Sequence, residues 1–269
     1  MEQRFKQLAE YTFQMGVFAK ENQSKIHRKT KADGTYITET DLTISDNMIK
    51  MIGELYPEAN VITEENNLTV FNSKAPLTFI VDPIDGTTAY SRGMPTWAVS
   101  VGIIDAKRTP IGAIISLPRF GYNSESSFFV FEPNSNVVYL NGKPFEISME
   151  GHDEMHDIIT GDRTWKCIKM PDFSCKLRSL CSSVVDMISQ ILFVDFAATI
   201  NDAGCYAWDI AGTDAILSHY GIHTILSDGT NALYTDDYLV KRKAYPLPVY
   251  AATPKVLEFM LKNFTVKIR

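Results

Sequence analysis

The stretch FIVDPIDGTT, residues 79–88, places two carboxylates, a glycine and two hydroxyls directly after an apolar run. Residues 79–81 predict a short buried strand, and the proline and the Asp-Gly step that follow predict that it stops in a turn. Asp82 and Asp85 would then lie at the end of the strand, with the Ile84 carbonyl between them. Carboxylate and carbonyl oxygens at such a bend can converge on one Mg²⁺ ion. Taken alone, the stretch fits a surface turn equally well.

The residues after this bend favour the binding of an anion. If residues 87–90 open a helix, the backbone N–H groups of Gly86, Thr87 and Thr88 face the space beside the two carboxylates. Such a set of N–H groups suits a phosphate. The stretch therefore predicts a phosphate site next to a metal site.

Two further acidic segments occur where predicted elements begin or end. VITEEN, residues 61–66, is an apolar run that ends in Glu64 and Glu65, and YAWDIAG, residues 206–212, puts Asp209 at the start of a helical pattern. Each segment has an ordinary explanation, because Glu64 and Glu65 fit a solvated loop and Asp209 fits an acid favoured by a helix dipole. Their joint occurrence in this order is the more specific observation.

Together these motifs resemble those of the inositol monophosphatase family, which consists of Mg²⁺-dependent, lithium-sensitive phosphatases. The family pattern is an acidic pair, then D-P-[IL]-D-G-T, then W-D-x-A-G, and this chain carries TEEN, VDPIDGTT and WDIAG in that order. The resemblance covers nearly the whole chain. It implies a mixed α/β fold, a layered α/β/α/β/α sandwich of the inositol monophosphatase and fructose-1,6-bisphosphatase type, with the active site where two lobes meet.

The resemblance also implies roles for individual residues. It places the metal ligands, for two to three Mg²⁺ ions, at Glu64, Asp82, Asp85 and Asp209 and at the Ile84 carbonyl. It assigns the activation of a water molecule to Thr87 and Asp41, since Asp41 lies in a T-D step 23 residues before Glu64, as in the family. From its own context, Asp41 fits the capped N-terminus of a helix equally well.

The implied reaction is hydrolysis of a phosphate monoester of a small polyol by an activated water, without a phosphoenzyme. We expect inositol monophosphate as the substrate, and histidinol phosphate, a 3′-phosphoadenosine nucleotide or fructose 1,6-bisphosphate as alternatives. Substrate contacts are expected at Asp202, which replaces the family's usual Glu seven residues before Asp209, and at Ser182. A catalytically idle scaffold that binds a macromolecule is the alternative from another class, and the intact site acids and Thr87 argue against it.

Composition agrees with an enzyme and argues against a nucleic-acid partner. The chain has 269 residues, 45% of them hydrophobic, which is enough for a large core. Its net charge of −6 and pI near 5.4 do not fit a nucleic-acid groove, where a basic face is expected. The site acids would repel one another and an anionic substrate unless cations bind there. These acids are Asp41, Glu64, Glu65, Asp82, Asp85 and Asp209.

Location and assembly are expectations of the same kind. The sequence shows neither a signal peptide nor an apolar run of membrane-spanning length, and its four cysteines lack zinc-site spacing, so we expect a cytoplasmic protein without membrane contact. The resemblance implies a homodimer that acts on a small phosphorylated metabolite. His219 and His223 flank Gly221, which breaks the helical register, so we interpret them as surface or core residues rather than ligands.

The periodic patterns predict two closely fused lobes, an N-terminal α+β lobe over residues 1–145 that carries the metal loop and a C-terminal α/β lobe over 146–269. Helices are predicted at 2–24, 48–56, 182–192, 210–220 and 254–263. Strands are predicted at 97–105, 111–117, 128–131, 137–140, 158–161, 193–199, 223–226 and 249–252. The first four of these strands should form a mostly antiparallel meander.

Overall fold

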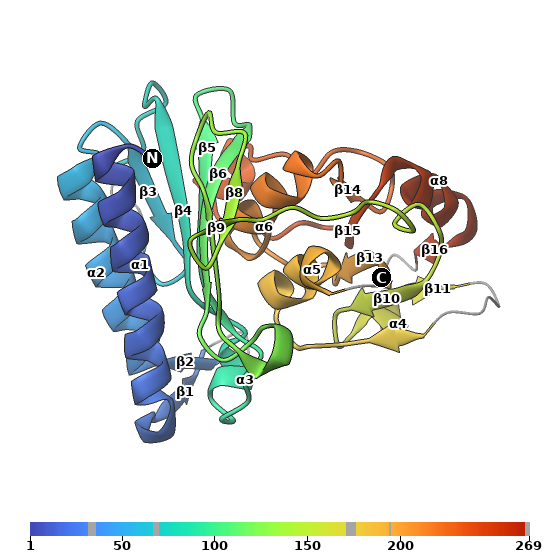
Figure 1. Ribbon diagram of the computed structural model, residues 1–269, viewed down its shortest axis with the longest axis horizontal. Coiled ribbons are helices and arrows are strands. Elements are labelled where there is room, and N and C mark those ends of the chain that lie inside the picture. Colours follow the sequence, from blue (N-terminus) through green and yellow to red (C-terminus); the bar gives the residue numbers. More distant parts are fainter. Residues whose placement is uncertain (32–35, 67–69, 171–175, 194, 267–269) are drawn as a thin grey trace.

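Helices and sheets alternate in five layers along the long axis of the molecule (Figure 1). The computed structural model describes residues 1–31, 36–66, 70–170, 176–193 and 195–266. A helix pair, a seven-stranded sheet, a second helix pair, a five-stranded sheet and an outer helix follow one another. This is the α/β/α/β/α sandwich predicted from the sequence. The division into lobes at residue 145 stays a prediction.

The first layer contains two helices whose apolar stripes face the larger sheet. They are α1 (Gln3–Asn22) and α2 (Glu39–Leu55). Phe5 and Leu8 of α1 and Ile44 and Met48 of α2 are buried in one cluster with the facing strands. The spacing of these side chains follows the helical repeat, as the sequence predicted for the first helix.

The seven-stranded sheet has the order β3-β4-β5-β6-β7-β8-β9, and only β3 and β4 pair in parallel. Its strands are β3 (Asn60–Thr63), β4 (Leu77–Asp85), β5 (Ala98–Asp105), β6 (Pro110–Leu117), β7 (Ser127–Phe131), β8 (Val138–Leu140) and β9 (Lys143–Pro144). The run from β4 to β9 is the antiparallel meander predicted for this part of the chain. Asn134 and Asn141 have positive φ, which fits turns between consecutive strands of this meander.

The strand that leads into the metal loop is longer than predicted. β4 continues to Asp85 instead of stopping after Val81. Asp82 pairs with Ser100 and Asp85 pairs with Ala98, so β4 has one more residue than β5 across this interval. This irregularity accommodates the proline, which cannot donate to a regular ladder. Because side chains alternate along a regular strand, the extra residue turns Asp82 and Asp85 toward the same side.

The central layer consists of α5 (Ser183–Leu192) and α6 (Ala207–His219), which lie between the two sheets (Figure 1). A Cβ on Gly102 of β5 would lie 2.6 Å from the backbone of Ala211, and a Cβ on Gly212 would lie 2.6 Å from the Ser100 hydroxyl. These contacts mean that α6 lies directly on the backbone of β5. The close approach fixes where the first turn of α6, with Asp209, meets β4.

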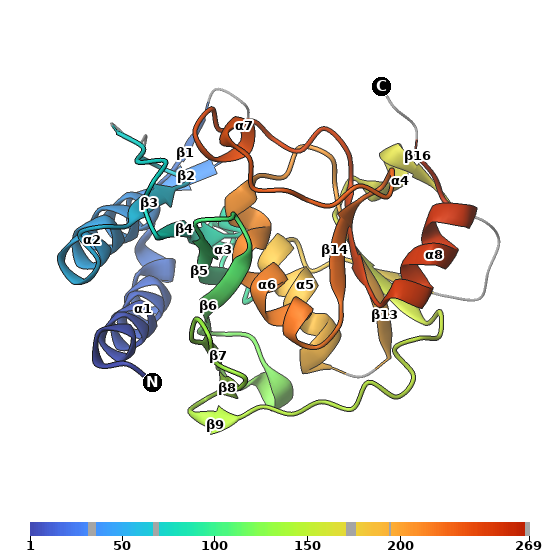
Figure 2. The same ribbon diagram turned by 90° about the horizontal axis from the view of Figure 1, so that it is seen from above.

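The five-stranded sheet has the order β12-β10-β13-β15-β14 and is covered on its outer face by α8 (Figure 2). Its strands are β10 (Asp157–Thr160), β12 (Leu177–Arg178), β13 (Phe196–Asn201), β14 (His223–Leu226) and β15 (Val249–Ala252), and α8 spans Pro254–Asn263. α5 ends at Leu192 as predicted, but β13 begins three residues later than predicted, because Asp195 lies in a bend with a positive φ just before the strand.

Short elements complete the described chain. They are β1 (Arg28–Thr30), β2 (Tyr36–Thr38), α3 (Thr87–Tyr90), α4 (Thr164–Cys167), β11 (Ile168–Lys169), α7 (Asp236–Leu239), β16 (Thr265–Val266) and the 3₁₀ turns at Gln23–Lys25 and Tyr122–Ser124. Among the described residues, no helix has both the length and the apolar character needed to cross a membrane.

Candidate active site

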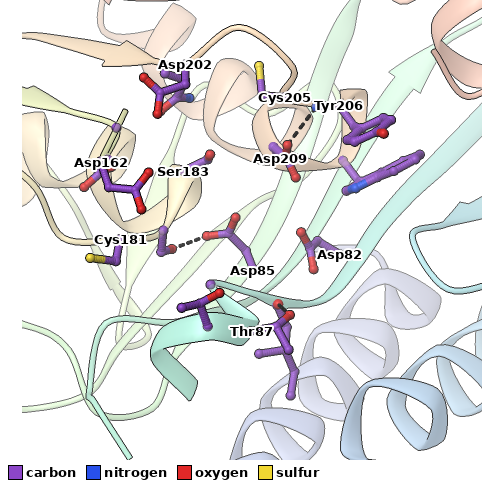
Figure 3. Close-up of a pocket in the computed structure, with 18 of the residues that line it drawn as sticks. Asp82, Asp85, Thr87, Asp162, Cys181, Ser183, Asp202, Cys205, Tyr206 and Asp209 are labelled. Carbon is purple, nitrogen blue, oxygen red and sulfur yellow. Dashed lines mark hydrogen bonds between the residues drawn. The ribbon is translucent and has the colours of Figure 1, made fainter. Parts of the chain in front are cut away.

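A cavity of about 420 Å³ opens where β4, the first turns of α3, α5 and α6 and the end of β13 come together (Figure 3). Nearly all of the residues predicted for the site line it. They are Glu64, Asp82, Ile84, Asp85, Gly86, Thr87, Thr88, Ser182, Asp202 and Asp209. Asp41 and Glu65 are in contact with this set through Thr87 and Lys31, which are described below.

Three carboxylates converge in this cavity. Asp82, Asp85 and Asp209 each present an oxygen within 4.8 Å of the others, although Asp209 comes from a different part of the chain. Asp82 Oδ1 is buried and has no hydrogen-bond partner among the described residues. A buried oxygen without a donor is costly, and a metal ion would complete it. The donor set therefore fits Mg²⁺, which prefers oxygen ligands.

Burial raises the pKa values of these acids. Loss of solvent, followed by repulsion from neighbouring carboxylates, holds the pKa values of Asp82 and Asp209 well above their usual range. Burial likewise raises the pKa of Asp85 to about 7, although hydrogen bonds from Ser182 and Val184 oppose the shift. A bound cation would reverse this effect, because it favours the ionised form.

Asp85 is held by the first turn of α5. The Ser182 hydroxyl and the backbone N–H of Val184 both donate to Asp85 Oδ2, the latter at 2.9 Å (Figure 3). Ser182 Oγ also accepts a hydrogen bond of 3.1 Å from the N–H of Val185, so it caps α5. Ser182 therefore lines the cavity as predicted and orients Asp85 at the same time, while its predicted substrate contact stays a prediction.

Asp209 belongs to the first turn of α6, as the helical pattern predicted. Its Oδ2 accepts a hydrogen bond of 2.7 Å from the backbone N–H of Tyr206, the residue that caps the helix (Figure 3). The rings of Tyr206 and Trp208 are stacked, with centroids 4.6 Å apart. One carboxylate group therefore completes the helix end and also contributes to the acidic cluster.

Asp41 likewise takes part in capping a helix, α2, and also contacts a residue of the site. Its Oδ2 accepts hydrogen bonds from the backbone N–H and the hydroxyl of Thr38, the former at 2.9 Å. Its Oδ1 lies 3.2 Å from the hydroxyl of Thr87, which also lies 2.9 Å from the Ile84 carbonyl oxygen. Burial raises the pKa of Asp41 to about 6. The structure thus brings together the two residues predicted to activate water.

Glu64 and Glu65 follow β3 and share one cation. Lys31 Nζ lies 2.9 Å from Glu64 Oε1 and 2.7 Å from Glu65 Oε1. Burial raises the pKa of Glu65 to about 7, with repulsion from Glu64 adding to the shift. Glu64 lies outside the group of three converging carboxylates, but it lines the same cavity.

Gly86 is the residue that allows the chain to turn under the cavity. Its φ of +85° lies in the left-handed region, which favours glycine. A Cβ there would lie 2.8 Å from the Ser182 Cβ and 3.0 Å from the Thr96 carbonyl oxygen. The left-handed turn starts α3 as predicted and places residues 86–88 beside Asp85.

Residues 6–257 match the sequence profile of the Inositol monophosphatase family. The chain belongs to this family. Like its fellow members, it is a phosphatase, and the family resemblance inferred from the sequence motifs is confirmed.

Individual relatives of this inositol monophosphatase family member differ in activity. It is 25% identical to inositol monophosphatase 1 of Solanum lycopersicum, over 72% of this chain and 73% of the relative. It is 23% identical to histidinol-phosphatase of Mycobacterium tuberculosis, over 80% and 87%. The fold also matches a solved structure of an IMPase/NADP phosphatase complexed with Mg²⁺ and phosphate, with a TM-score of 0.73, 16% identity and coverage of 96% and 93%.

The far side of the cavity carries two acids and Arg163, whose Nε lies 3.7 Å from Asp162 and 3.9 Å from Asp202. Asp162 and Asp202 lie across the cavity from Asp82 (Figure 3). The two oxygens of Asp202 accept hydrogen bonds from the N–H of Arg163, at 2.9 Å, and from the hydroxyl of Thr164, at 2.7 Å. Asp202 therefore lines the cavity and orders the start of α4, while its contact with a substrate alcohol stays a prediction.

Several residues of this site carried no signal in the sequence. Lys31 belongs to a basic run that fits a solvated surface, and only the fold brings it to Glu64. Asp186 lines the cavity from α5, although the helical pattern of the sequence did not indicate a site residue there. Burial holds the pKa of Asp186 well above its usual range. Arg242 contacts the backbone around Glu64 from 178 residues away.

Other predictions are consistent with these positions. His219 and His223 are exposed, which fits the surface position predicted for them, and they do not line this cavity. Cys181 is an exposed thiol at the cavity and Cys205 a buried one, and Cys175 lies outside the described residues.

Proposed function

We propose that this chain hydrolyses the phosphate monoester of a small polyol in a Mg²⁺-dependent reaction, with inositol monophosphate as the substrate. One observation carries the proposal. The carboxylates of Asp82, Asp85 and Asp209 converge next to the Thr87–Asp41 pair, and the buried Asp82 Oδ1 has no hydrogen-bond donor among the described residues. Membership of the family and the similar fold of a phosphatase that holds Mg²⁺ and phosphate support it.

The residues that would hold two to three Mg²⁺ ions are Glu64, Asp82, Asp85, Asp209 and the Ile84 carbonyl. Magnesium supplies Lewis-acid chemistry at such a site, since it neutralises charge on phosphate oxygens and makes a water molecule more acidic. Because Asp82 and Asp85 are needed as ligands, neither is free to act as a nucleophile.

The chain's own contribution is to orient water and phosphate. The Thr87 hydroxyl donates to Asp41, so its oxygen can accept a hydrogen bond from the attacking water. Asp41, with a pKa of about 6, can take up the proton near neutral pH. The backbone N–H groups of Gly86, Thr87 and Thr88 would stabilise charge on the phosphoryl oxygens. Ser182 and Asp202 would contact the alcohol.

Histidinol phosphate is the second candidate, and the acidic far side of the cavity favours it. Asp162 and Asp202 share Arg163, so together they keep one net negative charge, which would attract an ammonium group on the alcohol part of the substrate, and they could also accept hydrogen bonds from hydroxyls. A relative named histidinol-phosphatase is compatible with this possibility. Inositol monophosphate stays the first candidate, because the chemistry proposed for the converging acids and the Thr87–Asp41 pair does not require a charged group on the alcohol part of the substrate.

Phosphate release from a panel of substrates tests the proposal. Inositol 1-phosphate, histidinol phosphate, a 3′-phosphoadenosine nucleotide and fructose 1,6-bisphosphate are compared with Mg²⁺ and with EDTA. We expect turnover only with Mg²⁺, highest for inositol 1-phosphate, and none for Asp209→Asn. Release that persists in EDTA, or no release from any of the four substrates, contradicts the proposal.

Lithium sensitivity, a cytoplasmic location and a homodimeric state are further parts of the proposal. Lithium sensitivity and the homodimeric state rest on the family resemblance, and the location rests on the cysteine pattern and on the lack of signal-peptide and membrane-span patterns. LiCl should reduce turnover while an equal concentration of NaCl does not. Light scattering of the purified chain measures the assembly state.

A further inference from the structure

Arg242 joins the loop that carries Glu64 to the first turn of α6. Its Nη1 donates to the carbonyl oxygens of Thr63, at 2.8 Å, and Asn66, at 3.2 Å, and its Nη2 donates to the carbonyl oxygen of Glu64. The same guanidinium lies over the Trp208 ring, 4.6 Å from its centroid. One side chain therefore contacts the backbone on both sides of a predicted metal ligand and the residue next to Asp209.

This contact matters because Glu64 comes from a different element than the other predicted ligands. Asp82 and Asp85 are fixed by β4, and Asp209 is fixed by the close packing of α6 on β5. Glu64 follows the end of β3, where its side chain is held by Lys31. The position of the Glu64 backbone relative to α6 therefore depends on contacts such as those of Arg242.

We propose that Arg242 is a positioning residue for the metal site, which keeps the Glu64 carboxylate within reach of an ion bound at Asp82, Asp85 and Asp209. The inference rests on the proposed function, because it presupposes that these acids bind a divalent cation. Arg242 acts through the backbone of the loop and does not line the cavity.

Only arginine has the geometry for this role. Its planar guanidinium offers several donors in one plane and can lie flat on an aromatic ring. Lysine keeps the charge but has a single donor centre, so it cannot reach three carbonyl oxygens and stack on Trp208 together. Arg242→Lys should therefore lose most of the positioning effect while leaving the charge near Glu64 unchanged.

Arg108 provides a matched control. It also lies over an aromatic ring, 4.8 Å from the centroid of Phe71, and it has a positive φ like Arg242. Among the described residues, its hydrogen bonds go to the Tyr234 carbonyl, at 3.4 Å, and to the Asp236 carboxylate. Arg108→Ala thus removes a comparable side chain that, unlike Arg242, does not hydrogen-bond to the backbone of residues 63–66.

The test is Mn²⁺ binding to the full chain, followed by electron paramagnetic resonance and by calorimetry. In Arg242→Ala, the dissociation constant of one ion should rise roughly 10- to 100-fold, as found when groups that orient metal ligands are removed. Arg242→Lys should show most of this loss, and Arg108→Ala should bind like the unmodified chain. Glu64→Gln should show the same loss, and the Arg242→Ala/Glu64→Gln double variant should bind no more weakly than Glu64→Gln.

Each outcome has a distinct meaning. If the unmodified chain binds no Mn²⁺, the proposed function fails and this inference with it. If it binds Mn²⁺ and Arg242→Ala binds equally well, only the inference is overturned. Additive losses in the double variant also overturn it, since Arg242 would then act elsewhere. If Arg242→Ala does not fold, as judged by its melting curve in EDTA, the affinity of Arg242→Lys decides in the same way.

Discussion

The hydroxyl of Thr87 lies 3.2 Å from a carboxylate oxygen of Asp41, although the two residues are 46 positions apart in the chain. Thr87 is placed by the left-handed turn at Gly86, and Asp41 by the first turn of α2. Two independent elements thus deliver a hydroxyl and a carboxylate to the edge of the acidic cluster. This pair is where the proposed chemistry can be separated from binding.

Thr87→Ala and Asp41→Asn should each lower kcat by roughly 10²- to 10⁴-fold while KM changes little, because the pair acts on the water in the transition state. Initial rates of phosphate release over a range of substrate concentrations measure both constants. Thr43→Ala serves as the control, since Thr43 is exposed on α2 and donates only to the Glu39 carbonyl within its own helix. Full kcat in Thr87→Ala would show that the pair does not activate water.

Stability of the metal-free protein should fall as the pH rises. Burial raises the pKa values of Asp41 to about 6 and of Asp85 to about 7, from ordinary values of 3.8. The folded state therefore binds more protons than the unfolded state between about pH 4 and pH 7, so deprotonation in this window removes stability. We expect a lower Tm at pH 8 than at pH 5 in EDTA.

Magnesium should reverse this trend. It binds only the folded, ionised site, so its effect on Tm should be larger at pH 8 than at pH 5. Thermal melting in EDTA and in excess Mg²⁺, each at pH 5 and at pH 8, gives the four Tm values that the comparison needs. Identical curves with and without Mg²⁺ at pH 8 would argue against a metal site at these acids.

Asp85→Asn should separate stability from activity. The amide removes a buried charge from the metal-free cluster, and its oxygen can still accept the hydrogen bond from the N–H of Val184. In EDTA at pH 8 the variant should melt at the same temperature as the unmodified chain or higher, whereas turnover with Mg²⁺ should be lost. Asp228→Asn is the control, because hydrogen bonds from Thr230 lower the pKa of that exposed acid. A clear drop in the Tm of Asp85→Asn in EDTA would contradict the argument.

Much of the fold could be predicted because local patterns and tertiary packing agree. Strands at 223–226 and 249–252 and the helix at 254–263 are found at the predicted residues, since turn residues or a proline mark their ends. The start of β13 was misplaced because the prediction ran the strand through Asp195, a bend residue with a positive φ that separates β13 from α5. β4 was predicted too short because a proline usually ends a strand, whereas here an extra residue accommodates it.

The candidate site was predictable where the motif and the local geometry coincide. Asp41 and Asp209 each fitted both a helix-capping role and a site role. The structure shows that one oxygen of each caps its helix, while Asp209 also belongs to the converging carboxylates and Asp41 also contacts Thr87. Lys31 and Arg242 could not be found, because each acts through contacts with a distant segment. Each belongs to a short basic run, and such a run has no local pattern that distinguishes this role from a solvated surface.

Asp202 is the position where substrate recognition can be separated from structure. Asp202→Ala should raise KM for the polyol phosphate on the order of tenfold, because a substrate hydroxyl would lose its acceptor in the cavity. KM for a simple aryl phosphate should change little, since that substrate has no hydroxyl to place there. Steady-state kinetics with the two substrates, for the unmodified chain and the variant, measure the difference.

The control must account for the second task of Asp202, which is to accept hydrogen bonds from the N–H of Arg163 and the hydroxyl of Thr164. Thr164→Ala removes one of these bonds and leaves the carboxylate in place, so it reports the cost of loosening α4 alone. If Thr164→Ala raises KM for the polyol phosphate as much as Asp202→Ala does, Asp202 acts by ordering α4. If Asp202→Ala affects both substrates equally, the alcohol binds to another part of the cavity wall. A selective effect of Asp202→Ala alone would place the alcohol against this carboxylate, because only direct contact distinguishes the two substrates.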